Sequence, residues 1–429
     1  MDDKQVMSAI VRNRRAEPEE VSRVKGIVET DDAEAAGNGR RLCFVVTVGS
    51  SLQSLCRGRF EYFQELGYDV TAVCAPTPEA SDIRARGVAL HTAPLTRSVS
   101  PFADLRAVWN LYRFFRRNRF DLVEVSTPKA ALIGSIASRL ARVPCLLHLL
   151  RGLSYQQQRG VGGRLLIWSF RVACRLPHHL ISISHFMMNQ AVRDGMCKAE
   201  DIKVLGDGSS NGIDLDRFRP RDPDKGRALR DAFGLPHDAL VVGFVGRFTG
   251  DKGIRELLTA YGRLRTIYPS LCLLMVGELE ARDRPEPHYV DMMENDERIV
   301  LTGWQADTSP FYHAMDVFTL PTHREGFGTV LLEAAACALP IVTTNETGWW
   351  HPNEEESSGL FVPIKDADEL QRAVAALLDD EALRTRLGQA ARARVERSYD
   401  CRQVWAMQAR EFATLIRKSE TTARRGKEH

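Results

Sequence analysis

Two cations lie five residues apart on a glycine-rich loop in the second half of this 429-residue chain. Arg247 and Lys252 belong to Gly246-Arg-Phe-Thr-Gly-Asp-Lys-Gly253, which follows an apolar run and precedes a stretch of helical pattern. A guanidinium and an ammonium on such a loop can bind one diphosphate. The Gly-Lys-Ser/Thr ending of a Walker loop is absent. A solvated turn that carries two surface charges is the competing interpretation.

Two carboxylates mark a second loop and the helix predicted after it. Glu325 lies in a glycine-punctuated stretch, and Glu333 lies eight residues later within the apolar run 330–339. Eight residues are slightly more than two helical turns, so both carboxylates can face one side. Carboxylates accept hydrogen bonds from hydroxyl groups such as those of a sugar or a ribose. The alternative is a helix-capping acid followed by an ordinary helical glutamate, although a glutamate within an apolar run is costly without a partner.

Other motifs give less direct indications. The loop Val48-Gly-Ser-Ser51 follows the first predicted strand, and its Gly49 and Ser50 can approach a phosphate or an acceptor. Asp214-Leu-Asp216 spells a DxD string, which in some enzymes holds a metal–nucleotide complex but is frequent by chance. No GxGxxG fingerprint is present, so a dinucleotide cofactor is not expected. The histidines lack metal-ligand spacing, so no metal is expected.

These residues must be positioned by alternating strands and helices. Short apolar runs without period-two alternation suit strands that are buried on both faces of a parallel sheet. The predicted strands are 42–48, 70–74, 122–125, 145–150, 180–183, 202–205, 240–245, 271–276, 299–301, 317–320, 341–343 and 359–362. Helical patterns separate several of them, which predicts an α/β protein with two doubly wound, Rossmann-like sheets. Ligands of such folds bind at the carboxyl ends of the strands, here in the cleft expected between the two domains.

The alternation is interrupted once, at a glycine- and serine-rich stretch followed by a charged run. Such a composition change is typical of a junction between domains. The predicted organisation is a flexible extension at 1–40, an N-terminal domain at 41–205, a junction at 206–225, a C-terminal domain at 226–400, a helix at 401–418 that packs back across the domains, and a flexible basic tail at 419–429.

Charge is distributed unevenly along the chain, although the formal net charge is only +2. Residues 101–200 carry fifteen Lys and Arg against five Asp and Glu, a net charge of +10, which leaves −8 for the rest. Two segments of this block, 105–120 and 163–175, mix arginines with aromatic residues at helical spacing. Interfacial membrane helices have this composition, and so do helices that pack on a sheet with arginines outside. The +10 block favours a membrane surface, and no nucleic-acid-binding module accompanies it.

The lack of a targeting signal in the sequence pattern and the distribution of the cysteines predict a cytoplasmic protein. No apolar run approaches the roughly 20 residues needed to span a bilayer, and residues 1–40 lack the apolar core of a signal peptide. The nine cysteines are odd in number, form no CxxC pair and lie mostly in apolar runs. This pattern predicts buried free thiols in a reducing compartment.

The two loops, taken together, resemble those of the retaining GT-B glycosyltransferases of family four. The matching residues are GRFTGDKG at 246–253, EGFG at 325–328 with Glu333 in an E-x7-E arrangement, and Asn211-Gly-Ile-Asp-x3-Phe218, and the resemblance spans roughly 41–416. The segments 125–134 and 150–155 are similar to those of bacterial enzymes that add a sugar, often an N-acetylhexosamine from a UDP donor, to a polyprenyl-diphosphate carrier. One departure is Arg151-Gly152, because many relatives carry His-Gly there.

The resemblance implies roles for the matching positions. Arg247 and Lys252 would neutralise the departing diphosphate, and Glu325 would hold hydroxyls of the donor sugar; these three are the expected catalytic residues. Glu333 would hold the ribose. The other expected donor-binding residues are Gly246, Gly326, Phe327, Gly328, Thr329 and Thr302, the last within a segment, 301–305, that would receive the base.

The implied function is retaining, metal-independent transfer of a hexose or N-acetylhexosamine from a UDP-sugar to a polyprenyl-diphosphate-linked or other anionic glycan acceptor. The N-terminal domain would bind the acceptor, with Gly49, Ser50 and Arg151 near its phosphate, and the C-terminal domain would bind the nucleotide sugar. The expected location is the cytoplasmic face of the bacterial inner membrane, with neither a cofactor nor a nucleic-acid partner. The alternatives are a GDP-mannose-type hexosyltransferase, a sugar-nucleotide epimerase, and a non-catalytic nucleotide-sugar-binding subunit.

Overall fold

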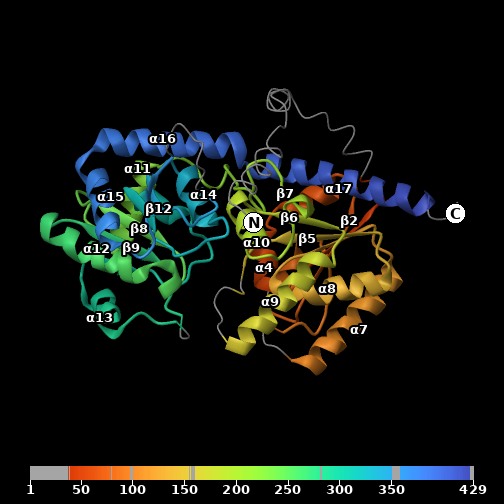
Figure 1. Ribbon diagram of the computed structural model, residues 1–429. Helices are drawn as coiled ribbons and strands as arrows, with labels where there is room; N and C mark the ends of the chain where they lie inside the picture. The colour runs from red at the N-terminus through yellow and green to blue at the C-terminus, as the bar shows by residue number, and fades with distance from the viewer. Residues whose placement is uncertain are drawn as a thin grey trace. The chain divides into compact units, whose positions relative to one another are not determined.

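The computed structural model describes residues 37, 39–78, 80–96, 100–153, 155, 160–280, 283–349 and 358–425. The chain divides into two compact units: unit 1 comprises the residues up to Asn211 together with those from Trp405 onward, and unit 2 comprises Gly212–Val404. Each unit contains one parallel sheet with helices on both of its faces (Figure 1). The predicted fold class of two doubly wound domains is therefore confirmed. Most of the extension expected at 1–40 lies outside the described residues.

Unit 1 is built on a seven-stranded parallel sheet in the order β3-β2-β1-β4-β5-β6-β7. Its strands are β1 (Arg41–Val45), β2 (Asp69–Cys74), β3 (Ala89–Thr92), β4 (Leu122–Val125), β5 (Cys145–Leu150), β6 (His179–Ser182) and β7 (Ile202–Val204). Its helices before the junction are α4 (Gly49–Leu55), α5 (Arg59–Glu65), α6 (Ala80–Ala85), α7 (Pro101–Asn118), α8 (Pro128–Ala141), α9 (Gly160–Arg175) and α10 (His185–Arg193). The strand order reverses between β1 and β4, and such a switch point is where α/β sheets bind ligands.

Unit 2 repeats this plan with a six-stranded parallel sheet in the order β10-β9-β8-β11-β12-β13. Its strands are β8 (Val241–Val245), β9 (Cys272–Val276), β10 (Ile299–Leu301), β11 (Val317–Leu320), β12 (Ile341–Thr344) and β13 (Leu360–Val362). Its helices are α11 (Pro223–Phe233), α12 (Ile254–Ile267), α13 (Pro287–Asn295), α14 (Thr329–Ala336), α15 (Ala367–Asp379) and α16 (Glu381–Ser398). The switch point here lies between β8 and β11, which pair directly.

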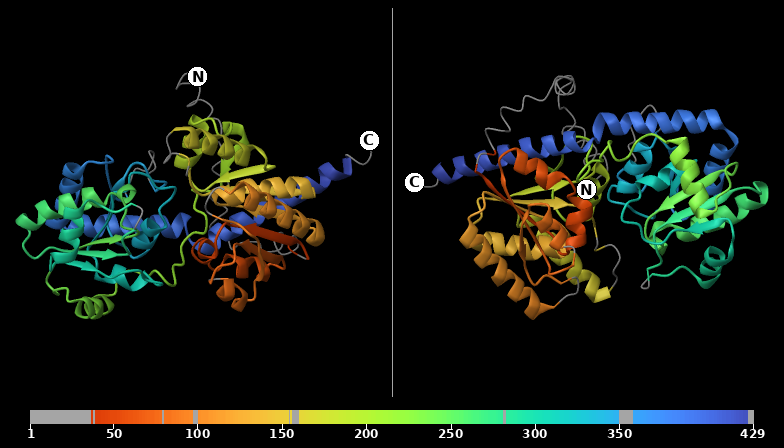
Figure 2. Two further views of the ribbon diagram at one scale, coloured as in Figure 1. Left: turned by 90° about the horizontal axis from the view of Figure 1, so that it is seen from below. Right: turned by 180° about the vertical axis from the view of Figure 1, so that it is seen from behind.

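Side chains of the central strands of unit 1 alternate between two cores, as the strand pleat requires. Cys43 and Val45 of β1 lie in the cluster that α7 and α8 cover. Phe44 points to the opposite face, where Phe412 of α17 (Cys401–Arg425) lies 6.3 Å from it between ring centroids. Phe412 also stacks on Phe63 of α5 at 5.3 Å. Figure 2 shows α17 running along this face of the sheet, so residues more than 300 positions apart share one core.

The division between the units falls inside the predicted junction, and α17 belongs to both units. Its first residues, up to Val404, group with unit 2, and those from Trp405 onward group with unit 1. In unit 2, the Ile213 N–H donates to Tyr399 O at 2.8 Å, and a Cβ on Gly212 would lie 2.7 Å from Cys401 Cα. In unit 1, Trp405 Nε1 donates to Asn211 Oδ1 at 2.9 Å. These contacts give the Asn-Gly-Ile-Asp motif a structural role, because its first residues pack against the segment 399–405.

The structure differs from the sequence-based expectation at two places. The half-polar strand β3 was not predicted, and α17 continues to Arg425 rather than ending at residue 418, so the expected tail is helical over 419–425. All nine cysteines are buried and free, as predicted. None of the described helices is both long and apolar enough to cross a membrane.

Candidate functional site

The two loops that carry the candidate cations and carboxylates leave the sheet of unit 2 from neighbouring strands. One loop follows β8 and the other follows β11, on either side of the switch point. The Asp251 carbonyl accepts hydrogen bonds from the His323 N–H at 2.8 Å and from Thr322 Oγ1 at 3.0 Å. Gly253 has φ +73°, and a Cβ there would lie 2.0 Å from the Pro321 carbonyl oxygen. The loops are therefore held together through their backbones, and glycine is required at their closest approach.

Lys252 and Glu325 meet where these loops touch. Lys252 Nζ donates to Glu325 Oε2, and both side chains are largely buried. From the sequence, Lys252 is expected to face a diphosphate and Glu325 to face sugar hydroxyls. Because Lys252 and Glu325 form an ion pair, a diphosphate bound by the ammonium and a sugar bound by the carboxylate would be adjacent to each other.

Arg247 is held by a different carboxylate, that of Glu280. The Arg247 guanidinium donates to Glu280 Oε2, and its side chain is 62% exposed. Glu280 follows β9 and was not among the residues predicted for the site. A signal was available, since this glutamate lies on the loop after the strand next to β8. The two candidate cations are thus brought to the same sheet edge but are neutralised separately.

Three glycines lie just after the carboxyl ends of neighbouring strands, beside these loops. Gly246, Gly277 and Gly303 follow β8, β9 and β10, and the Gly277 N–H donates to the Gly303 carbonyl at 3.1 Å. A Cβ on Gly277 would lie 1.9 Å from the Gly246 carbonyl oxygen. Thr302 lies beside Gly303 and donates its hydroxyl to the Gly303 carbonyl at 3.0 Å. At these three positions no Cβ atom covers the backbone, which allows a flat ligand group to approach it.

Glu333 of α14 is held by hydroxyl groups. Its Oε2 accepts from Tyr312 at 2.7 Å and from Thr308 Oγ1 at 2.9 Å. Burial raises the pKa of the Glu333 carboxyl, and these two hydrogen bonds offset part of that effect. Among the described residues, Oε1 has no hydrogen-bond partner, so it remains available to a ligand hydroxyl. The apolar run around Glu333 predicts that this glutamate needs a partner, but no sequence pattern identifies Thr308 or Tyr312 as that partner.

The start of α14 is shaped by the EGFG segment. Gly328 has φ +86° and precedes Thr329, the first residue of α14, and no side chain caps this end of the helix. Such an end presents backbone N–H groups to an anion. Gly326 lies between Glu325 and Phe327. The Phe327 ring is buried against Tyr399, with ring centroids 5.2 Å apart, so only its backbone can take part in a ligand site.

A carboxylate–histidine pair supports the loop after β11. Glu256, in the first turn of α12, contacts His323 Nε2 through Oε1 at 3.2 Å, and its Oε2 is buried without a partner among the described residues. Burial raises the pKa of Glu256, but hydrogen bonds from His323 and from its own backbone N–H outweigh this effect and leave it below the ordinary value. His323 is two residues from Glu325, so the Glu256–His323 pair supports the same loop that carries the partner of Lys252. No sequence pattern predicts this pair, because its members are 67 residues apart.

The candidate acceptor residues lie in unit 1. Gly49 and Ser50 open α4 after β1, beside the switch point, where Thr47 Oγ1 and Thr127 Oγ1 are hydrogen-bonded at 2.8 Å. Arg151 follows β5, apart from this switch point. Its guanidinium is buried 3.7 Å from the Glu124 carboxylate, and burial lowers its pKa. An acceptor phosphate would therefore have to share Arg151 with Glu124.

The DxD string and His148, the histidine of β5, have structural roles. Asp214 of the DxD string accepts hydrogen bonds from the N–H groups of Asp216 and Arg217 and so forms a turn. His148 is buried, with Nδ1 3.0 Å from the Ala173 carbonyl, and burial lowers its pKa to about 4. Within the ranges that the structure describes, no three His, Cys, Asp or Glu side chains gather in a way that could hold a metal ion.

Comparisons with known proteins match both units. The family model "Glycosyl transferases group 1" matches residues 226–394, and "Glycosyl transferase 4-like domain" matches residues 56–208. The capsular polysaccharide biosynthesis glycosyltransferase CapM of Staphylococcus aureus is 30% identical over 382 residues, which are 89% of this chain and 99% of CapM. The UDP-Gal:alpha-D-GlcNAc-diphosphoundecaprenol alpha-1,3-galactosyltransferase of Escherichia coli is 26% identical over 78% of this chain and 86% of its own length.

A solved structure shares the fold. HepE of Anabaena, crystallised with UDP and glucose, superposes with a TM-score of 0.72 over 87% of this chain and 99% of HepE, at 19% identity. At this identity the likeness concerns the architecture of two parallel-sheet domains.

Proposed function

The chain belongs to the GT-B glycosyltransferases of family four, and from this premise we propose a retaining enzyme that transfers a hexose or N-acetylhexosamine from a UDP-sugar. The proposed acceptor is a polyprenyl-diphosphate-linked saccharide in the assembly of a bacterial cell-surface glycan. The E. coli relative is named for a UDP-galactose donor and a diphosphoundecaprenol-linked acceptor, and CapM is named for capsular polysaccharide biosynthesis. HepE was crystallised with UDP and glucose. These names support the proposed substrate classes.

The observation that carries the proposal is the Lys252–Glu325 pair at the β8–β11 switch point, with Glu333 on the helix that follows. A nucleotide sugar contains the groups that these side chains suit. Its diphosphate would face Lys252 and Arg247, its sugar hydroxyls would face Glu325, and its ribose would face Glu333. The glycine edge beside β8 to β10 would receive the flat base.

Retaining transfer would proceed through an oxocarbenium-like state. The bond between the anomeric carbon and the diphosphate oxygen breaks, and its electron pair leaves with UDP. The acceptor oxygen then attacks from the same face and passes its proton to the leaving phosphate, so no protein nucleophile is assigned. Negative charge grows on the diphosphate, and Lys252 and Arg247 are placed to stabilise it. The diphosphate would replace Glu280 as the partner of Arg247.

Thermal unfolding with a panel of UDP-, GDP- and ADP-sugars tests the donor assignment, because a ligand that binds only the folded state raises its stability. We expect the UDP-sugars to raise Tm and the others to leave it unchanged. A product assay with a diphosphoundecaprenol-linked saccharide then tests transfer. Stabilisation by a GDP-sugar alone would contradict the UDP assignment. Conversion of the donor without any acceptor would indicate an epimerase, and binding without turnover would indicate a non-catalytic subunit.

Metal independence gives a second expected result. If Lys252 and Arg247 supply the charge that stabilises the leaving diphosphate, activity should be retained in excess EDTA. The measurement is the initial transfer rate after chelation, with and without added Mg²⁺ or Mn²⁺. Loss of the rate in EDTA, with recovery on addition of one divalent ion, would overturn this part of the mechanism.

The raised pKa of Glu333 predicts how donor binding depends on pH. A carboxyl with a raised pKa is protonated at a higher pH than an ordinary glutamate, and the protonated form accepts ribose hydroxyls less well. The donor KM should therefore rise as the pH falls through this raised pKa. In Glu333→Gln, the donor KM should be raised about tenfold at neutral pH, as for one lost charged hydrogen bond, and should lose the acid dependence. An unchanged pH profile in this variant would remove Glu333 from the donor site.

Substitution of His323 should reduce turnover although His323 is not expected to contact the ligand. His323→Leu leaves the buried Glu256 carboxylate without its side-chain donor and removes one side-chain support of the loop that carries Glu325, whose backbone hydrogen bonds remain. We expect kcat to fall about tenfold, as for the loss of one charged hydrogen bond, with a smaller change in donor KM. His323→Asn retains an N–H donor and should recover part of the rate. His237→Leu changes an exposed histidine that pairs with Asp231 and serves as the control; equal loss in all three variants would contradict a positioning role.

A further inference from the structure

The outward face of α7 has an unusual composition. Its exposed side chains are Pro101, Phe102, Leu105, Arg106, Trp109, Arg113, Arg116 and Arg117. From Phe102 onward these positions follow the spacing of a single helical face. The first part of the face is mainly apolar, with Phe102 89% and Trp109 60% exposed. The later part is basic, and the one acid of the helix, Asp104, is half-buried 2.7 Å from Lys129.

Two neighbouring helices continue this pattern. The exposed side chains described on α9 are Arg164, Leu165, Trp168, Arg171 and Arg175, and those on α8 are Pro128, Arg139 and Leu140. Helix α8 contacts both α7 and α9, so the three helices lie side by side on one face of the unit 1 sheet (Figure 1). Among the described side chains of these helices, none of the exposed ones is acidic. We call this set the α7–α9 face.

An ordinary solvated helix face mixes acids with lysines, and large exposed apolar residues occur singly. In unit 1, all of the large hydrophobic side chains found exposed among the described residues lie on the α7–α9 face: Phe102, Leu105, Trp109, Leu140, Leu165 and Trp168. Exposed apolar side chains that gather in this way mark an interaction surface. Arginine and tryptophan are the residues that anchor interfacial helices at a bilayer, because their side chains combine an apolar body with a polar end.

We propose that the α7–α9 face binds an anionic lipid bilayer, with its aromatic and leucine side chains in the headgroup region and its arginines against lipid phosphates. The choice of a bilayer rests on the proposed function, because a polyprenyl-linked acceptor is held in one. Charge complementarity supports this partner, since the face is positive and bacterial inner leaflets are negative. A second copy of the chain is disfavoured, because a two-fold interface would set arginines against arginines.

Vesicle co-sedimentation of the full chain tests the proposal. Vesicles of phosphatidylcholine alone are compared with vesicles that contain phosphatidylglycerol, at low and high salt. We expect binding to the anionic vesicles, weakened at high salt because screening reduces the attraction. The double variant Trp109→Ser with Trp168→Ser should bind them at least tenfold more weakly. Arg113→Gln with Arg116→Gln should weaken binding only to the anionic vesicles.

Control variants distinguish membrane binding from misfolding and from self-association. Trp304→Ser removes a comparably exposed indole from unit 2 and should leave vesicle binding unchanged. Transfer to a short-chain, water-soluble acceptor should be unchanged in the Trp109/Trp168 variant, which also shows that the variant is folded.

If the wild-type protein transfers sugar to the soluble acceptor but does not bind anionic vesicles, the surface proposal fails and the enzymatic function stands. If it binds vesicles but transfers no sugar, the function fails instead. A change in oligomeric state without a change in vesicle binding would identify a self-association surface and overturn the proposal.

Discussion

Lys252→Ala should reduce kcat by roughly 10²–10³, the effect of removing one preorganised charged donor from a developing anion. Lys252 lies on the glycine-rich loop after β8 and is oriented by Glu325 before any ligand arrives. The alanine variant loses the charge where the diphosphate is expected to leave. Steady-state kinetics with the identified donor measure kcat and KM. Unchanged turnover would remove Lys252 from the catalytic residues.

The loss should be one of catalysis and not of folding. Glu325 keeps a quarter of its side chain exposed, so water can solvate its carboxylate when the ammonium is absent. The unfolding temperature should therefore move little. Lys225→Ala is the matched control, because Lys225 is an exposed lysine of the same unit. A double-mutant cycle with Glu325→Gln shows whether Lys252 acts on the substrate or only by holding Glu325. Equal rates in Lys252→Ala, Glu325→Gln and the double variant would show that the two side chains act as one unit.

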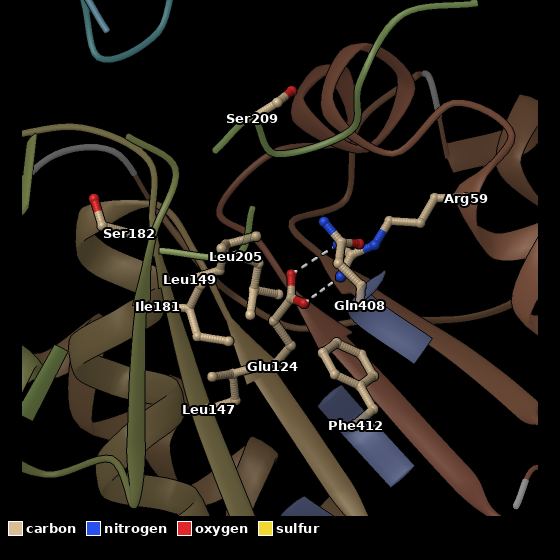
Figure 3. A pocket seen from close by; sticks show the side chains of 10 residues that line it. All are labelled: Arg59, Glu124, Leu147, Leu149, Ile181, Ser182, Leu205, Ser209, Gln408 and Phe412. Atoms are coloured by element: carbon tan, nitrogen blue, oxygen red, sulfur yellow. Dashed lines mark hydrogen bonds and ion pairs between the residues drawn. The ribbon is translucent and has the colours of Figure 1, made fainter. Parts of the chain in front are cut away.

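Glu124→Leu should strongly destabilise unit 1. Glu124 of β4 forms a buried bidentate pair with Arg59 of α5, at 2.6 and 3.0 Å (Figure 3). The Arg59 guanidinium also lies 4.9 Å from the Phe44 ring centroid and 5.7 Å from that of Phe412. Removing one partner of a buried pair costs about 3–5 kcal/mol, because the other charge remains buried. Glu124→Leu leaves two buried guanidinium groups, those of Arg59 and Arg151, without their carboxylate.

The ranking of the variants by their free energy of unfolding is the more specific prediction. Arg59→Met leaves Glu124 with Arg151, which is only 3.7 Å away, so this variant should lose less stability than Glu124→Leu. The double variant Arg59→Met with Glu124→Leu should recover part of the loss, because an apolar pair can replace a buried ion pair. Lys198→Ala removes an exposed pair with Glu200 and should leave stability unchanged. Urea unfolding gives the free energies. Equal losses in Arg59→Met and Glu124→Leu would show that Arg151 does not share the carboxylate.

Much of the architecture was accessible from hydrophobic patterning. The twelve predicted strands correspond to β1, β2 and β4–β13, because strands buried on both faces appear as continuous apolar runs. Among the strands of the described residues, only β3 was not predicted; it lies at the edge of its sheet and contains His91, whose ring stacks on Phe114 at 3.8 Å. A short strand at the edge of a sheet has only one pairing partner. Because β3 is not buried on both faces, its sequence does not have to be a continuous apolar run. Its formation depends on β2, which pairs with it, and on the helix side chain that covers it.

The sequence by itself determined the alternation of apolar strands and helices along the chain, the family, and the residue types at the candidate donor site. Tertiary structure alone decided which charged groups meet. Lys252 and Glu325 pair because β8 and β11 flank the switch point, and Glu333 is held by Tyr312 through the folding of a separate segment. The same holds for the α7–α9 face: the sequence showed many arginines, but only packing against the sheet showed that the acid of α7 is half-buried while the tryptophans are exposed. Local patterning is read along the chain, whereas charge pairing and exposure depend on residues that folding brings together from distant positions.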